Sequence, residues 1–104
     1  MPFEMIVGLR VTDAVTYTRY RAAIAPLLEA AGGRFRYDFE IGRTLRGEAG
    51  VEINRLFFLS FPSAEARDEF FAGSQYRAAR SAYFEPSVSE VIVLGEVSTP
   101  EGAG

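Results

Sequence analysis

The stretch that decides the fold runs from Arg55 to Arg80 and reads RLFFLSFPSAEARDEFFAGSQYRAAR. Residues Asn54–Phe61 are apolar on both alternating faces, which predicts a strand that is covered on both sides and therefore central in its sheet. Pro62 stops this strand, and Ser63 is a favourable N-cap for a helix. Gly73 then ends that helix. The stretch thus predicts a buried strand that leads directly into a capped helix.

The end of the same stretch predicts a second, shorter helix. Ser74 can cap it, and we expect it to run to about Phe84, with Pro86 closing it. Tyr76 and Arg80 are four residues apart and therefore share one face of this helix. Two roles are compatible with the pair: binding an anionic oxygen of a ligand, or pinning the helix through a hydrogen bond and stacking.

The rest of the chain supplies three strands and one long helix. Apolar residues recur at every second position in three segments, which predicts strands there. These strands are Phe3–Val11, Arg34–Ile41 and Val88–Val97. Helical spacing from Asp13 to Ala31 predicts a helix with a kink at Pro26, which Gly32-Gly33 ends. Residues 42–53 carry three glycines and mixed charge, and read as a connection.

The resulting order, βαββαβ, is that of the ferredoxin-like α+β fold. This fold has a four-stranded antiparallel sheet with helices on one face. We expect one domain over residues 1–97 and a flexible C-terminal tail over 98–104. The helices leave one face of the sheet open, and apolar residues such as Leu56 and Phe58 would be exposed there. Two such faces packing together would form a homodimer, a dimeric α/β barrel.

Composition excludes several kinds of chemistry. The 104 residues include no Cys and no His, and all eleven basic residues are Arg. Thiolate nucleophiles, disulfides, lysine Schiff bases and the usual nitrogen and sulfur metal ligands are therefore absent. We expect neither a metal nor an organic cofactor. Any general base would have to be a carboxylate or a tyrosine.

Charge and hydropathy exclude other partners. The formal charge of −3 is small, and no basic stripe suggests a nucleic acid partner. No segment approaches the ~18 continuous apolar residues of a membrane span. The N-terminus has no basic region before its short apolar run, so it does not resemble a signal peptide. A cytoplasmic location is the expectation.

The ordered motifs resemble those of the DUF1330 family over about residues 3–97. They are Val11-Thr12-Asp13, Tyr17, Tyr20, Ala25-Pro26, Gly32-Gly33-Arg34-Phe35, Phe61-Pro62-Ser63, Ala66, Phe70, Ser74-x-Tyr76 with Arg80, and Val91-Ile92-Val93 with Gly95-Glu96. The resemblance implies a dimeric α+β barrel. The wider superfamily includes cofactor-free monooxygenases, cyclases, isomerases and haem enzymes, whereas DUF1330 itself has no assigned reaction.

The chain departs from the family pattern at three places. Ala31 stands where His or Tyr is frequent, and Arg46 follows Leu45 where the family usually has Glu. Phe70 or Phe71 replaces a common Trp. If the missing His and Glu serve chemistry in relatives, this chain does not share it.

Charged residues on the second strand form the first candidate site. Arg34 and Arg36 could bind a carboxylate or enolate oxygen, and Asp38, with its pKa raised by an apolar wall, could be a base. The alternative is a solvated edge strand whose charges prevent edge pairing, with Arg34 packing at a helix end. Glu48 is a second candidate base if the loop 42–53 folds over the cavity as a lid.

Two functions are compatible with these observations. The first is a homodimer that binds, or converts without a cofactor, a small oxygen-bearing organic molecule in a cavity between sheet and helices. Tyr76 and Arg80 would join Arg34 and Arg36 in holding it, and Tyr17 and Tyr20 would be core or pocket wall. The second is a non-catalytic binding or assembly module whose interior is filled by its own aromatics. Those aromatics are Phe39, Phe57, Phe58 and Phe61.

Overall fold

The computed structural model describes residues 2–98. The strands are β1 (Phe3–Val11), β2 (Arg34–Glu40), β3 (Arg55–Phe61) and β4 (Val88–Ser98). The α-helices are α1 (Ala14–Ala30), α2 (Ala64–Ala72), α3 (Ser74–Ala79) and α4 (Glu85–Ser87), with a 3-10 turn η1 (Glu48–Gly50) and a π turn η2 (Arg80–Phe84). The predicted element order is confirmed. Of the predicted tail, Ser98 belongs to β4, and residues 99–104 lie outside the described residues.

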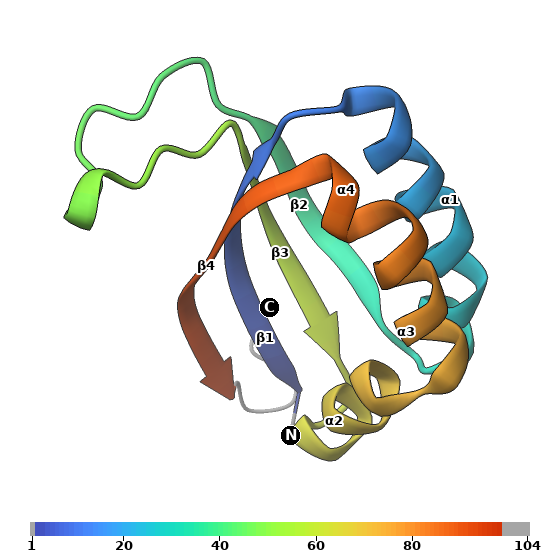
Figure 1. Ribbon diagram of the computed structural model, residues 1–104. Coiled ribbons are helices and arrows are strands. Elements are labelled where there is room, and N and C mark those ends of the chain that lie inside the picture. The colour runs from blue at the N-terminus through green and yellow to red at the C-terminus, as the bar shows by residue number, and fades with distance from the viewer. Residues whose placement is uncertain (1, 99–104) are drawn as a thin grey trace.

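The molecule has two layers, a four-stranded antiparallel sheet and a layer of helices on one of its faces (Figure 1). The strand order is β2-β3-β1-β4, so β3 is an inner strand, as its two apolar faces predicted. One side of β1 and β3 faces the helices and forms the core with them. The core residues of these two strands are Phe3, Met5, Val7, Leu9, Phe57, Leu59 and Phe61.

The long helix α1 is a single element, with Pro26 inside it. Asp13 caps it by accepting a hydrogen bond from the Thr16 amide at 3.1 Å. Gly32 ends it with a positive φ of 75°, a conformation that costs glycine little. Both termini therefore agree with the sequence prediction.

A β-bulge at Arg36 changes the predicted alternation of β2. Phe35 lies opposite Leu59, whereas Tyr37 lies opposite Phe58, so one residue of β2 is skipped between them. The bulge turns Tyr37 to the face of the sheet away from the helices and Asp38 to the helix side. The prediction that all odd-numbered residues of β2 share one face is therefore wrong.

A second bulge lies in β4 and has the same effect. Val93 pairs with Val7 and Gly95 pairs with Ile6, which leaves Leu94 without an opposite residue. The alternation of side chains between the two faces of the sheet is therefore reversed after Leu94. As a result, Val97 points away from the helices. Strict alternation over Val88–Val97 predicts Val97 on the same face as Val93, and this prediction is wrong.

The second helical segment is longer than predicted. It runs without a break from Ser74 to Ser87, and Pro86 lies inside its last turn rather than after its end. Ser74 begins the helix but does not cap it with its side chain. The amide of Glu85 bonds to the carbonyl of Arg80, five residues back, which defines the π turn. Because the ring of Pro86 crowds the carbonyl four residues before it, we attribute the wider turn to this proline.

The connection from residue 41 to 54 is a hairpin arm that projects beyond the sheet, on the side away from α1 (Figure 1). Its base is held by Asn54, whose side chain accepts from the Val11 amide and donates to the Val11 carbonyl, both at 2.8 Å. Thr44 bonds twice to Ile53 further along the arm. The arm is therefore an extension of the β2–β3 hairpin.

Candidate functional site

A cavity of about 250 Å³ lies between the helix side of the sheet and the segment α3–η2. Its walls are mainly aliphatic and aromatic side chains. The lining residues are Met5, Val7, Leu9, Tyr20, Ile24, Phe35, Phe57, Leu59, Phe70, Phe71, Tyr76, Arg80, Phe84, Val91 and Val93. Val91 and Val93 of β4 are about half exposed although they face the helix layer, so the helices do not cover β4 fully. The cavity therefore opens beside this strand.

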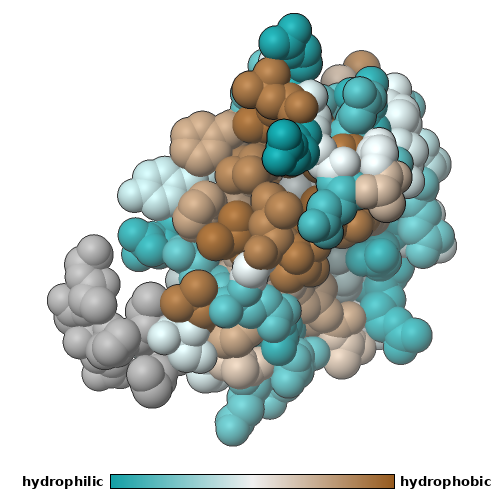
Figure 2. All heavy atoms as spheres, turned by 90° about the vertical axis from the view of Figure 1, so that its left-hand side faces the viewer, coloured by the Kyte–Doolittle hydropathy of each residue, from teal (hydrophilic) through white to brown (hydrophobic). Residues whose placement is uncertain are grey.

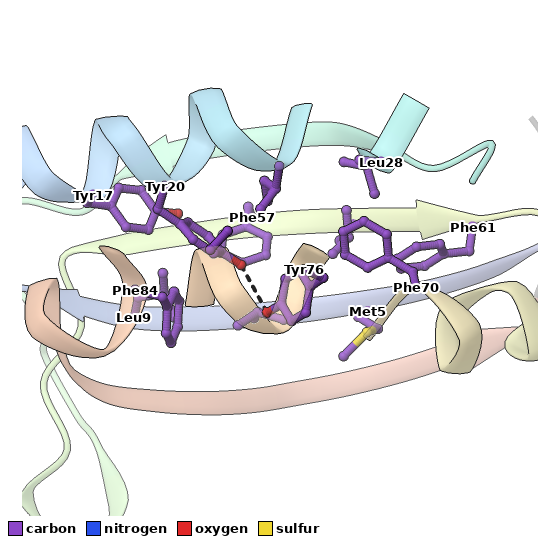
Figure 3. Packing of buried hydrophobic residues seen from close by; sticks show 14 of the residues in the cluster. Met5, Leu9, Tyr17, Tyr20, Leu28, Phe57, Phe61, Phe70, Tyr76 and Phe84 are labelled. Atoms are coloured by element: carbon purple, nitrogen blue, oxygen red, sulfur yellow. Dashed lines mark hydrogen bonds between the residues drawn. The ribbon is translucent and has the colours of Figure 1, made fainter. Parts of the chain in front are cut away.

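Two tyrosines form a polar point among these apolar walls. The hydroxyl of Tyr20, on α1, lies 3.0 Å from the hydroxyl of Tyr76, on α3 (Figure 3). Both side chains are buried. Burial raises the pKa of Tyr20 far above its ordinary value, and the neighbouring Tyr76 hydroxyl adds to the effect. Tyr20 is therefore a neutral hydrogen-bonding group and not a phenolate base.

Tyr20 also packs against aromatic rings that line the same cavity. Its ring lies 4.9 Å from that of Phe84 and 6.3 Å from that of Tyr76. Phe70 and Phe71 in turn contact Tyr76 at 4.9 and 5.0 Å. These tilted and edge-to-face contacts hold the ring of Tyr76 in place.

Arg80 is the one cation among the described residues that line the cavity. Its side chain is 45% exposed, and its nearest ion-pair partner, Glu85, lies 4.0 Å away at the limit of an ion pair. The guanidinium carbon lies 4.9 Å from the centre of the Phe84 ring. Arg80 is thus held beside the mouth with hydrogen-bond donors to spare.

Asp38 belongs to a separate ionic network at the edge of the sheet. Arg55 donates two hydrogen bonds to it and Arg21 donates one, each at 2.9 Å. Burial alone would raise the pKa of Asp38, but the hydrogen bonds and charges of Arg55 and Arg21 outweigh it and hold that pKa below the ordinary value. The expected raised pKa is therefore wrong, and Asp38 is poorly suited to be a base.

Arg21 connects this network to the core. It lies 3.6 Å above the centre of the Phe35 ring and donates to the Tyr17 hydroxyl at 3.1 Å. Asp38 is thus the centre of an arrangement that ties α1 to β2 and β3. No pattern in the sequence indicates this arrangement, because the bulge at Arg36 is what turns Asp38 toward α1.

The other predicted site residues lie away from the cavity. Arg34 is exposed opposite Ser60, on the far face of the sheet. Arg36 lies on that same face, where it donates to the Glu4 carboxylate at 3.0 Å. Glu48 is exposed in the η1 turn of the arm, and no arm residue lines the cavity. The structure therefore does not bring these residues together at one site. The arm does not cover the cavity as a lid.

The structure brings together only Tyr76 and Arg80 of the predicted set, and adds Tyr20 to them. Tyr20 had been assigned to the core or the pocket wall, and it lies in that wall. Phe84, Val91 and Val93 were not predicted. The sequence indicates only weakly that these residues line a cavity, because their exposure depends on how far the helices extend over β4.

A second hollow, of about 440 Å³, is more open to solvent. It lies between the end of α1 and the junction of α2 with α3, and Glu69 is the one charged residue in its lining. Across residues 2–98 no three acidic side chains gather in a way that would hold a metal ion. Within the same part of the chain, the helices lack the length and apolarity needed to cross a bilayer.

The face of the sheet away from the helices, here called the open face, is rich in apolar side chains. Its apolar residues are Ile6, Tyr37, Phe39, Leu56, Phe58, Ile92 and Val97. Tyr37 and Phe39 stack with parallel rings 6.1 Å apart, and both are nearly half exposed. Figure 2, which shows the side turned away from α1, displays a continuous apolar region there. A face of this kind is unusual on a monomer.

Together, the fold and the cavity define a small ferredoxin-like α+β protein with an apolar pocket under its helices. The family model for "Domain of unknown function (DUF1330)" matches residues 5–97. The chain belongs to the DUF1330 family, as its motifs predicted. No curated protein matches it.

Solved structures share this fold at low sequence identity. The RPA0582 protein of Rhodopseudomonas palustris, of unknown function, is 19% identical with a TM-score of 0.77, over 96% of this chain and 83% of that one. A dimeric protein of unknown function with a ferredoxin-like fold from Bacteroides fragilis is 13% identical with a TM-score of 0.61, over 94% and 96%.

A third similar structure is described by an activity. It is a putative antibiotic biosynthesis monooxygenase from Caulobacter crescentus, 14% identical with a TM-score of 0.65, over 96% of this chain and 91% of that one. At such identities the likeness establishes the ferredoxin-like fold and nothing about the reaction.

Proposed function

We propose that this protein is a homodimer whose subunits each bind a small, partly apolar, oxygen-bearing organic molecule in the cavity beneath α3 and η2. One observation carries the proposal: an apolar cavity of about 250 Å³ contains a paired set of phenols and one cation. Ligand sites typically combine apolar walls with a few such polar groups. Tyr20, Tyr76 and Arg80 are the proposed binding residues.

The lining favours binding over proton abstraction. It contains no carboxylate, and Tyr20 is held neutral by burial. Asp38 and Glu48 lie outside it. If the bound molecule is converted, its own functional groups must supply the base or react with oxygen, with Tyr20, Tyr76 and Arg80 stabilising the developing negative charge.

The alternative is an assembly module with a filled interior. Phe57 and Phe61 do fill the core, whereas Phe39 and Phe58 lie on the open face. Two of the four aromatics assigned to the interior are therefore outside it, which leaves room for the cavity. The same two residues support the dimer, because packing two open faces together would bury them.

A fragment screen by thermal shift tests the proposed cavity. We expect hits among small aromatic compounds that carry oxygen, since a ligand that binds only the folded state raises the melting temperature. Val93→Trp would fill the mouth with an indole and should abolish the shifts. The matched control is Val15→Trp, because Val15 is 67% exposed on α1 and lines no part of the cavity. Hits that survive Val93→Trp would contradict this site.

A further inference from the structure

We infer that the cavity takes a small planar monoacid, with its carboxylate on Arg80 at the mouth and a second oxygen, an acceptor, on the Tyr20–Tyr76 pair. This inference rests on the proposed function and specifies the class of its ligand. It follows from where the polar groups of the lining lie: the cation is at the exposed end and the two phenols are in the buried part.

We assign the ligand's carboxylate to Arg80 by comparing Arg80 with the other arginines that lie near acidic side chains. Arg21, Arg36, Arg55 and Arg67 each bond to a carboxylate within 3.0 Å. Arg80 does not, since its contact with Glu85 is 4.0 Å long, and the two side chains are 45% and 62% exposed. A planar guanidinium with unused donors binds a carboxylate through two parallel hydrogen bonds. The Arg80 guanidinium carbon lies 4.9 Å from the centre of the Phe84 ring, which also lines the cavity.

The second oxygen is assigned from the hydrogen-bond count of the tyrosine pair. Two hydroxyls carry two protons, and the single bond between Tyr20 and Tyr76 uses one of them. The other proton is free to be donated to a ligand. Because the raised pKa keeps Tyr20 protonated, the pair offers a donor throughout the neutral range. A carbonyl or ether oxygen is therefore the matching group.

The size and shape of the cavity limit the rest of the molecule. A volume of about 250 Å³ limits the ligand to one ring with short substituents. Seven of the lining side chains are aromatic, which favours a flat ring between them. Tyr76 and Arg80 are one helical turn apart, so their Cα atoms are separated by about 6 Å along the axis. A ring with oxygen at both ends matches this arrangement.

Three probes of nearly equal shape test the assignment. 4-Acetylbenzoate carries both proposed groups, 4-acetylbenzamide lacks the charge, and 4-isopropylbenzoate lacks the acceptor oxygen. Binding is measured by calorimetry and by the amide spectra of the labelled protein. We expect 4-acetylbenzoate to bind about tenfold more tightly than the amide, since a charge-assisted bidentate contact is lost. We expect a several-fold loss for the isopropyl compound.

Variants locate each contribution. Arg80→Gln should remove the preference for acid over amide, whereas Arg77→Gln, exposed on the same helix and outside the cavity, should keep it. The double variant Tyr20→Phe/Tyr76→Phe should remove the preference for acetyl over isopropyl, whereas each single variant keeps one hydroxyl with a free proton and should retain a preference. Amide spectra of each free variant show whether it is folded.

The outcomes separate this inference from the proposed function. Equal binding of all three probes, abolished by Val93→Trp, would overturn the inference and leave the cavity as a binding site. A preference for the acid that survives Arg80→Gln would also overturn it. Absence of binding by all three probes together with a fragment screen without hits would overturn both.

Discussion

The hydroxyl of Tyr20 on α1 lies 3.0 Å from the hydroxyl of Tyr76 on α3, and this contact links the two helical segments across the cavity. Removing one partner leaves the other buried hydroxyl without its bond, which typically costs about 1–3 kcal/mol. We therefore expect Tyr76→Phe to lower the free energy of unfolding by about 1–2 kcal/mol, as measured by urea denaturation.

A double-mutant cycle isolates this contact. Tyr20→Phe combined with Tyr76→Phe removes both hydroxyls, so the double variant should lose about 1 kcal/mol less than the sum of the single losses. Tyr83→Phe is the control, because Tyr83 lies on the same helical segment and outside the cavity lining. Additive losses at Tyr20 and Tyr76 would show that the two hydroxyls do not interact in solution.

Asp38 gives a prediction for acid stability. Its pKa in the folded protein lies below the ordinary value, through Arg55 and Arg21. A depressed pKa contributes stability that is fully present above the unfolded pKa of ~3.9 and is lost as pH falls through the folded pKa. We expect Asp38→Asn to cost about 1–2 kcal/mol at pH 7, between the values for surface and buried pairs.

The measurement is the free energy of unfolding of both proteins between pH 7 and pH 2. The difference between wild type and Asp38→Asn should be constant above about pH 5 and should shrink below ~3.9 as the wild-type carboxyl protonates. Asp68→Asn serves as a control, because the Asp68 side chain is 69% exposed. A difference that does not change with pH would contradict the assigned ion pairs.

The open face predicts the assembly state. Phe58→Glu places a charge in the centre of the proposed interface, where it would be buried without a partner. We expect wild type to have twice the mass of the 11.5 kDa chain in light scattering at micromolar concentration, and Phe58→Glu to have the single mass. Val15→Glu, on the outer face of α1, should stay dimeric. A monomeric wild type would refute the dimer through this face.

Pro86 predicts an effect on the cavity from a residue outside its lining. In Pro86→Ala the crowding that widens the η2 turn is removed, so the turn can relax to an α-helix. That change would rotate Phe84, which lies within the widened turn, relative to Arg80 and Tyr76. We expect Pro86→Ala to weaken 4-acetylbenzoate binding several-fold while the protein stays folded, as judged by its amide spectra. Unchanged binding would show that the proline does not set this geometry.

Much of the fold could be predicted from local sequence signals. The ends of β1 follow from the alternation of apolar residues, and the ends of α1 follow from its caps. The central place of β3 follows from its apolar residues on both faces. The faces of β2 and β4 could not be predicted, because a bulge at Arg36 or Leu94 leaves the apolar alternation in the sequence intact.

The candidate site was predictable only where one helix supplies it. Tyr76 and Arg80 share a helical face, so their spacing alone places them together. Their partner Tyr20 comes from a helix 56 residues away, and that contact depends on how the two helices pack on the sheet. The assignment of Arg34, Arg36 and Asp38 to one site was wrong because the bulge separates them onto two faces.

A crystal structure of the protein with 4-acetylbenzoate tests the account most directly. We predict density for the ligand in the cavity, with its carboxylate within about 3 Å of the Arg80 guanidinium and its acetyl oxygen at a similar distance from Tyr20 or Tyr76. An unoccupied cavity in crystals that show the ligand elsewhere, or a ligand whose carboxylate avoids Arg80, would contradict the account.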